Sequence, residues 1–130
     1  STRSPQWTGG GVVFAPTPRD YSFKLNKKEK RLALKSALTS RLQENKLIVV
    51  DELKFDEEKT KNFKQVMDNL KVEKGLVILA ENDANTVLSA RNLASIDTTL
   101  TSQINVYDIM KAGTIVLTKD SAAKIEEVYA

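Results

Sequence analysis

The sequence predicts a three-layer α/β/α fold, with a parallel sheet between two layers of helices, preceded by an irregular basic arm. From about residue 24 onward, short aliphatic runs alternate with amphipathic helical patterns, as in strands joined by right-handed helical crossovers. Before that point, residues 1–23 contain all three prolines, three of the five glycines and four of the eight aromatic residues, which suits neither helix nor ordinary strand. We therefore expect an arm at residues 1–23 and a globular α/β domain at residues 24–130.

The arm combines residues with opposite tendencies. The three glycines at positions 9–11 have no side chains to pack and lose much conformational entropy on ordering. The aromatic residues are too apolar for a free linker: Trp7, Phe14, Tyr21 and Phe23. We expect a molecule outside this chain to order the arm. Because the chain begins without a Met, we also expect that an upstream portion is missing.

The first helix is expected over residues 26–45. Asn26 is a good N-cap residue, and Glu29, three positions later, can accept a hydrogen bond from the backbone N–H of Asn26, as in a capping box. Its expected buried stripe, which must pack on the sheet, follows helical spacing: Leu34, Ala37, Leu38 and Leu42.

The first strand is expected at residues 47–50. This run is continuously aliphatic, which is typical of a strand covered on both faces. Asp56 is expected to cap a second helix, and Gly75 to end the connection into a strand at residues 76–80. The buried face of the second helix is expected to contain Phe63, Val66, Met67 and Leu70.

The alternation continues to the end of the chain. A third helix is expected at residues 85–93 and a weaker strand at residues 98–101. Asn105, followed three positions later by Asp108, should open a short helix at residues 106–111. The remaining expectations are a strand at 114–118 after Gly113, a helix at 121–129, and inward side chains at Val87, Leu88, Ala90, Ile125 and Val128.

Charge is divided unevenly along the chain. Residues 1–50 contain ten Lys or Arg against three Asp or Glu, a net charge of +7, and the rest contains ten against fourteen, a net charge of −4. Such segregation indicates a polyanionic partner for the first third. The alternative is a well-solvated helix and tail with no specific partner.

Several classes of function are disfavoured. The chain has no Cys and no His, which excludes thiol chemistry, Cys/His zinc sites and triads that need an imidazole. The glycines at 9–11 are not followed by Gly-Lys-Ser/Thr, and no G-x-G-x-x-G follows a strand, so no nucleotide cofactor is indicated. We expect no cofactor and no metal. No run approaches a membrane span and no signal peptide opens the chain, so we expect a cytoplasmic protein.

The amino end of the first helix breaks a local rule. Aligned peptide dipoles give this end a partial positive charge, so each cation there costs on the order of 0.3–1 kcal/mol at low salt. Only Glu29 opposes the cations, and a phosphate backbone would relieve their repulsion. The alternative, lysines snorkelling along a solvated face, accounts for one or two of them rather than five. The five are Lys24, Lys27, Lys28, Lys30 and Arg31, with Arg3 and Arg19 upstream.

Polar residues at the carboxyl ends of the strands suggest a second hypothesis. Asp51, Glu52 and Asp120 could line the crevice where open α/β sheets bind ligands, as in a receiver-like, magnesium-binding phosphotransfer domain. Glu81 follows the expected second strand where such chemistry needs an Asp nucleophile. Asp, Glu and Thr after strands also cap the next helix with no further role, and we favour that interpretation. The neighbouring polar residues are Asp83, Thr118 and Lys119.

The arm contains the residue types that irregular RNA-binding segments use. Arginines pair with phosphates, aromatic rings stack on unpaired bases, and glycines let the backbone approach a groove. In the third helix, Arg91 could contact RNA or remain in solvent.

These residues resemble the bacterial-type L4 family of large-subunit ribosomal proteins. The longest and most specific match is residues 3–21 (RSPQWTGGGVVFAPTPRDY), where the long loop of that family rejoins its globular body. Further matches are residues 31–38 (RLALKSAL), 50–53 (VDEL), 59–61 (KTK), 88–92 (LSARN) and 126–128 (EEV). Two positions depart from the family pattern, because Thr8 replaces a usual Arg and Asn26 a frequent Pro.

The resemblance implies a four-stranded parallel sheet between helices and no enzymatic activity. It implies a structural constituent of the large ribosomal subunit, located in the cytoplasm on the ribosome, that binds ribosomal RNA and neighbouring ribosomal proteins. In some bacteria it implies repression of the protein's own operon through its leader mRNA. The amino-terminal segment and the tunnel-lining loop tip of the family precede Ser1. Matched positions imply RNA contacts by Arg3, Gln6, Trp7, Arg19, Tyr21, Lys24, Lys27, Lys28, Arg31, Lys35 and Arg91.

Overall fold

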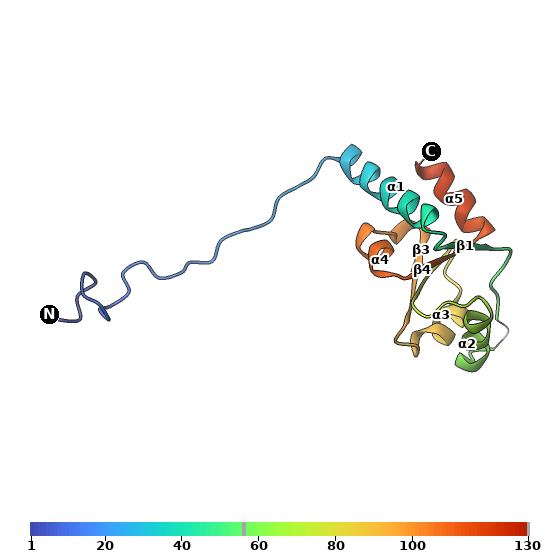
Figure 1. The fold of residues 1–130 in the computed structure, drawn as a ribbon, viewed down its shortest axis with the longest axis horizontal. Coiled ribbons are helices and arrows are strands. Elements are labelled where there is room, and N and C mark those ends of the chain that lie inside the picture. The colour runs from blue at the N-terminus through green and yellow to red at the C-terminus, as the bar shows by residue number, and fades with distance from the viewer. Residues whose placement is uncertain (56, 130) are drawn as a thin grey trace.

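The computed structural model describes residues 1–55 and 57–129, and in them helices and strands alternate as expected. The observed boundaries lie within a few residues of the predicted ones (Figure 1). The elements are α1 (Lys27–Gln43), β1 (Leu47–Val50), α2 (Thr60–Asn69), β2 (Gly75–Leu79), α3 (Ala84–Arg91), β3 (Ile96–Leu100), the 3-10 turn η1 (Thr101–Gln103), α4 (Val106–Lys111), β4 (Thr114–Thr118) and α5 (Lys119–Tyr129).

The four strands form one parallel sheet in the order β1-β4-β2-β3. The two central strands, β2 and β4, are in register from Gly75 opposite Thr114 and are almost entirely buried. β1 lies at an edge, and Val49 keeps 50% of its surface exposed. The expectation that residues 47–50 are covered on both faces was therefore wrong for this strand, because an edge strand has one neighbour and incomplete cover.

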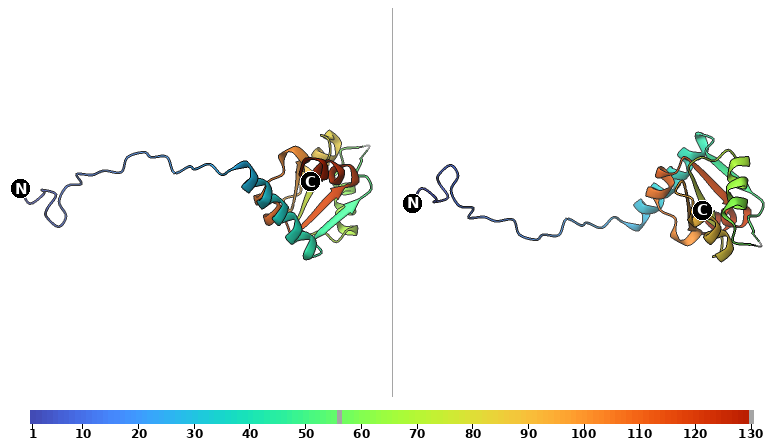
Figure 2. Two further views of the ribbon diagram at one scale, coloured as in Figure 1. Left: turned by 90° about the horizontal axis from the view of Figure 1, so that it is seen from above. Right: turned by 90° about the horizontal axis from the view of Figure 1, so that it is seen from below.

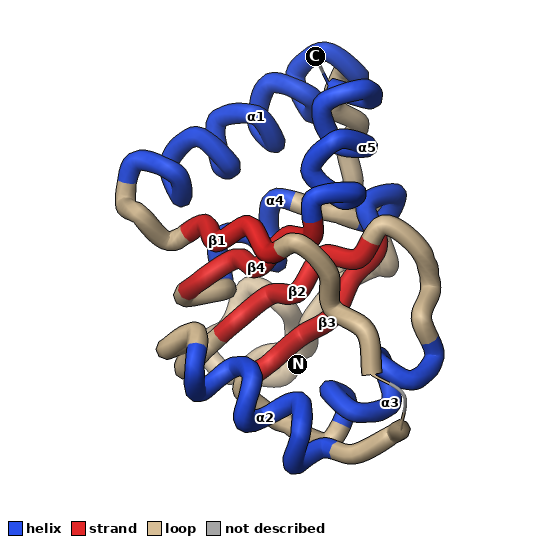
Figure 3. The backbone as a smooth tube through the Cα atoms, turned by 90° about the vertical axis from the view of Figure 1, so that its right-hand side faces the viewer, coloured by secondary structure: helices blue, strands red, loops and turns tan. Residues whose placement is uncertain are grey.

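Helices cover both faces of the sheet, which confirms the three-layer α/β/α prediction. Figure 3 shows α1, α4 and α5 on one side of the sheet and α2 and α3 on the other. Each face has its own apolar cluster. The first includes Leu34 and Ile109 with Ile78 of the sheet, and the second includes Phe63 and Met67 with Val77. These clusters stabilise the layers through burial of apolar surface.

The first helix has the predicted start but a different buried stripe. The backbone N–H of Asn26 donates to Glu29 Oε2 at 3.1 Å, the capping-box bond that the sequence predicts. Leu34 and Ala37 are buried, but Leu42 is 60% exposed, so its inclusion in the stripe was wrong. Arg41 occupies the buried position instead, with only 8% of its surface exposed.

Three other helices differ from expectation in detail. α2 begins at Thr60 with Lys59 at the N-cap position; the predicted cap residue, Asp56, lies outside the described residues. In α3 the fully buried side chains are Thr86, Ser89 and Ala90, whereas Val87 and Leu88 are half-buried. In α5 Ile125 packs on the first cluster, but Val128 is exposed and Tyr129 takes the inward position. In α3 and α5 the covered positions are thus neighbours of the predicted ones on the same helix.

The amino-terminal residues extend away from this body. Residues 1–25 contain no helix or strand and run outward from the start of α1 (Figures 1 and 2). Among the described residues, no hydrogen bond or ion pair joins residues 1–25 to the rest of the chain. The irregular structure expected of the arm is therefore present, and α1 is its point of attachment.

Candidate nucleic-acid interface

The basic end of α1 lies fully open to solvent. Lys27, Lys28 and Arg31 occupy the first two turns of the helix, and all three are exposed. Glu29 is the only acidic residue of the first turn, and it is used in the capping bond. The positive end of the helix dipole is therefore surrounded by cations with little local compensation, as the sequence predicts.

Cations elsewhere in the molecule are arranged differently. Within residues 1–55 and 57–129, none of the eight Lys and Arg side chains in the first 35 residues takes part in an ion pair, whereas seven of the twelve that follow do. The first 35 residues contain only two acidic side chains, Asp20 and Glu29. This region therefore has excess positive charge that the described part of the chain does not neutralise. The paired cations are Arg41, Lys46, Lys54, Lys59, Lys111, Lys119 and Lys124.

At the far end of the arm the backbone turns back on itself. The N–H of Gly11 donates to the carbonyl of Arg3 at 2.8 Å, and this bond closes a loop over residues 3–11. Three of the predicted RNA-contact residues, Arg3, Gln6 and Trp7, thereby lie on one small loop, and all three are exposed. The sequence predicts irregular structure here but not the closure of the loop.

A second pair of predicted residues is stacked in the arm. The guanidinium of Arg19 lies over the ring of Tyr21, 4.1 Å from its centre, in a cation–π contact. Between them, Asp20 accepts a 2.8 Å hydrogen bond from the backbone N–H of Ser22, which lowers the pKa of the Asp20 carboxyl. The single acidic side chain of the arm is thus bonded locally, and both Arg19 and Tyr21 are exposed to solvent.

The remaining predicted residues are not all on the same face. Lys35 is exposed on α1, one turn beyond Arg31, and extends the basic surface. Arg91 is exposed at the end of α3, which packs on the opposite face of the sheet (Figure 3). The structure therefore brings together the α1 cations but separates Arg91 from them.

Arg41 has a structural role that sequence reasoning missed. Its Nε donates to the carbonyl of Ile109 at 3.1 Å, its Nη2 donates to the carbonyl of Met110, and its Nη1 bonds Glu44 Oε2 at 3.0 Å. Arg41 thereby satisfies two carbonyls at the end of α4, which have no partner within that short helix. The signal was its position seven residues after Leu34, on the buried face of the helix.

The carboxyl ends of the strands do form a crevice, of about 900 Å³. Asp51, Glu52, Glu81, Asp83 and Asp120 all line it, as the sequence analysis expects of strand ends. Four of these carboxylates are engaged with neighbouring groups rather than gathered around one point: Asp51, Glu52, Glu81 and Asp83. Among residues 1–55 and 57–129, no three acidic side chains lie close enough together to hold a metal ion.

Individual contacts explain why these carboxylates do not gather around one point. Asp51 pairs with Lys119, which lowers the pKa of Asp51 and raises the pKa of Lys119. Asp83 accepts from the backbone N–H of Asn85 at 3.2 Å as the N-cap of α3, as the capping interpretation predicts. Thr118 is buried, and its hydroxyl is hydrogen-bonded to Ser121 Oγ at 2.6 Å. The Thr118 hydroxyl is therefore used inside the fold.

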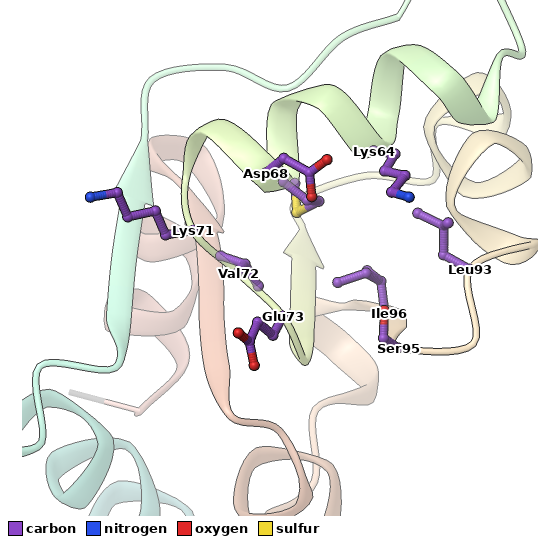
Figure 4. Close-up of a pocket in the computed structure, with 9 residues that line it drawn as sticks. Lys64, Asp68, Lys71, Val72, Glu73, Leu93, Ser95 and Ile96 are labelled. Carbon is purple, nitrogen blue, oxygen red and sulfur yellow. The ribbon is translucent and has the colours of Figure 1, made fainter.

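A smaller cavity of about 420 Å³ lies beside α2, at the amino ends of β2 and β3 (Figure 4). Its floor is apolar, with Val72 and Ile96 pointing inward. Its rim has charges of both signs. The predicted RNA-contact residues do not line it, and the mixed rim favours no charged ligand. The rim residues are Lys64, Asp68, Lys71 and Glu73.

No helix in the described part of the chain has both the length and the apolar character to cross a membrane.

A small α/β body with an exposed basic extension that lacks acidic partners is an arrangement typical of proteins that bind nucleic acid.

The chain belongs to the ribosomal protein L4/L1 family, whose sequence model matches residues 1–128. It is 66% identical to the large ribosomal subunit protein uL4 of Agathobacter rectalis over all 130 residues, which cover 63% of that protein. It is 64% identical to the protein of the same name from Lachnoclostridium phytofermentans, with the same coverage of both chains. With uL4 of Maridesulfovibrio salexigens, the identity is 51% over 127 residues, 98% of this chain and 62% of the relative.

These relatives confirm the resemblance to the L4 family, and they are named as ribosomal proteins rather than as enzymes. The chain spans about 63% of the length of these two relatives.

Proposed function

We propose that this chain is a structural constituent of the large ribosomal subunit that binds ribosomal RNA through its arm and the amino end of α1. The observation that carries this proposal is the excess of exposed cations in the first 35 residues. Lysine and arginine without acidic partners release counterions from an RNA backbone on binding, and this release contributes a large share of the affinity for nucleic acid. Family membership supports the same partner, since the relatives are named as proteins of the large ribosomal subunit.

The proposed contacts fall into two groups. Lys24, Lys27, Lys28, Arg31 and Lys35 would bind phosphates, with the helix end and its free backbone N–H groups adding to the attraction. In the arm, Arg3 and Arg19 would pair with phosphates, while Gln6, Trp7 and Tyr21 would contact bases or sugars. Arg91, on the other face of the sheet, would contact a separate RNA segment.

We also propose that the chain has two functional parts, the arm at residues 1–23 and the globular domain at residues 24–130. The absence of described hydrogen bonds between residues 1–25 and the body supports this division. In the ribosome, the body would sit against RNA and neighbouring ribosomal proteins, and the arm would reach into RNA beyond it.

Filter binding tests the proposal. The 130-residue chain should bind the large-subunit ribosomal RNA of Agathobacter rectalis, transcribed in vitro, more tightly than an antisense transcript of the same length. The preference should persist at salt concentrations that remove non-specific binding. Equal affinity for the two transcripts at every salt concentration would contradict the proposal.

A finer proposal concerns control of expression. If the chain also binds the leader mRNA of its own operon, the same basic surface would serve, because phosphate contacts do not depend on sequence. The leader transcript should then compete with ribosomal RNA for the chain. Failure to compete would restrict the function to the ribosome.

A further inference from the structure

The tip of the arm, residues 3–11, is a closed loop, a feature that the proposed function does not require. We call it the tip loop. Besides the closing bond from Gly11 to Arg3, the N–H of Trp7 donates to the carbonyl of Ser4 at 3.1 Å, and the N–H of Gly10 donates to the carbonyl of Trp7 at 2.9 Å. The path of this backbone is set by bonds within the loop and not by contact with the described part of the body.

Gly10 is the residue that permits this path. A Cβ atom at position 10 would lie 2.0 Å from the carbonyl oxygen of Ser4 and 2.9 Å from that of Trp7. Both neighbours are backbone atoms that cannot rotate away, so any side chain at position 10 must open the loop. Gly9 has a φ of +78°, which favours glycine, although a Cβ atom there would meet nothing within 4 Å.

Gly11 provides a natural comparison. A Cβ atom at this position would meet only the carbonyl oxygen of Arg3, at 3.5 Å, an ordinary van der Waals distance. Alanine is therefore compatible with the closed loop at position 11 and incompatible with it at position 10. Adjacent glycines of the same run thus have different structural requirements.

The closed loop determines how Trp7 is presented. The N–H and the carbonyl of Trp7 are both bonded inside the loop, so its backbone is held on both sides, while its side chain is 57% exposed. An exposed indole on a fixed backbone is a good stacking surface for an unpaired base, since every base has a π-face. Fixing the backbone beforehand also reduces the entropy lost on binding.

We infer that the tip loop is a preorganised site for one unpaired RNA base, and that Gly10 is a positioning residue that holds Trp7 in place for stacking. This inference rests on the proposed RNA-binding function. It differs from that function because a fully flexible arm would use Trp7 without needing a closed loop.

Fluorescence and filter binding together test it. Trp7 is the only tryptophan of the chain, so its emission reports on the tip loop alone. Adding the Agathobacter rectalis large-subunit RNA should quench the wild-type emission. Gly10→Ala should bind roughly five- to 150-fold more weakly, the loss expected for one stacked base, and should lose most of the quenching. Gly11→Ala should bind within about twofold of wild type.

A double-mutant cycle shows whether Gly10 acts through Trp7. In a Trp7→Ala background, Gly10→Ala should have little further effect on affinity. Thermal unfolding of the body should be the same in all variants, which separates a change in the loop from a loss of fold.

Each outcome is decisive. A wild-type chain that does not prefer ribosomal RNA to the antisense transcript overturns the proposed function and this inference with it. A wild-type chain that binds, with Gly10→Ala as tight as Gly11→Ala, overturns this inference alone. An equal loss for Gly10→Ala with and without Trp7 would show that Gly10 does not act through stacking.

Discussion

The first 35 residues and the rest of the chain use their cations in opposite ways. In the body, most of the cations are in ion pairs, and Arg41 is buried and bonded to backbone carbonyls and to Glu44. In the arm and the first turns of α1, the cations are exposed and have no described acidic partner. The difference shows that the same residue types stabilise the fold in one region and remain available for a polyanion in the other.

The largest expected effect comes from removing one of the two regions. Deleting residues 1–23 should weaken binding to ribosomal RNA roughly 100-fold, because two arginine contacts and the stacking side chains are lost. The melting temperature should change by less than about 2 °C, since the described bonds do not tie the arm to the body. Filter binding and circular dichroism measure the two quantities. A fall of more than about 5 °C would show that the arm belongs to the folded unit.

The next effect separates a structural cation from a binding one on the same helix. Arg41→Met should lower the free energy of unfolding by roughly 2–4 kcal/mol, because two carbonyls and Glu44 lose a buried partner. Arg31→Met, the matched control on the exposed side, should change stability by about 0.5 kcal/mol or less. Urea denaturation gives both values.

Binding should show the reverse order for these two variants. Arg31→Met should weaken RNA binding and reduce the salt dependence by about one phosphate contact, while Arg41→Met should leave the salt dependence unchanged. If both variants lose stability, or both lose RNA affinity, the distinction between the two regions is wrong.

The smallest effect concerns the acidic crevice. Lys119 lowers the pKa of Asp51 from the ordinary 3.8, so this carboxylate contributes stability above that pH and loses the contribution as pH falls through its lowered pKa. Because both side chains are exposed, Asp51→Asn should destabilise the chain only slightly at pH 7. The difference from wild type should shrink as pH falls below 3.8 in urea titrations at several pH values.

Lys119 sets the limit of this stabilisation at high pH. Asp51 raises the pKa of Lys119 from the ordinary 10.5, so the ion pair stabilises the fold below pH 10.5 and loses this contribution as the pH rises through the raised pKa.

RNA affinity should be unchanged or slightly higher in Asp51→Asn, because a negative charge near a polyanion is removed. A large loss of RNA affinity with the fold intact would place the binding face at the crevice instead.

Much of the fold could be predicted because local signals and burial agree. The strand at residues 114–118 and the helix at residues 106–111 have the predicted boundaries, and Asn105 accepts the backbone N–H of Asp108 at 2.8 Å as its cap. Such caps are short-range and can be read from spacing alone. The strand order could not be predicted, because it depends on how separate strands meet in space.

The error in the buried stripe of α1 follows from helix geometry. Leu42 follows Leu34 by eight residues, which turn the helix about 80° past two full turns. Arg41 follows Leu34 by seven residues, which turn the helix to within about 20° of two full turns. Arg41 therefore lies nearer the buried face than Leu42, and the carbonyls at the end of α4 supply its partners. That partner surface lies 68 residues away in the sequence, and periodicity does not reveal it.

The candidate site was predictable in its charge but not in its shape. The cations at the start of α1 follow directly from the sequence and the helix dipole. Closure of the tip loop depends on the close approach of Gly10 to the backbone carbonyl of Ser4. The run of three glycines indicates that the backbone comes close to another group, but it does not identify that group. The RNA contacts of these residues remain predictions.

The salt dependence of RNA binding tests the central claim most directly. If Arg3, Arg19, Lys24, Lys27, Lys28, Arg31 and Lys35 each meet a phosphate, the slope of log K against log salt should be roughly −5 to −6, from about 0.7–0.9 per contact. The double variant Lys28→Glu/Arg31→Glu should flatten that slope by about two contacts, while thermal stability holds or rises because acidic residues suit the amino end of a helix. Unchanged binding, or a loss of stability together with binding, would contradict the assignment of these cations to RNA.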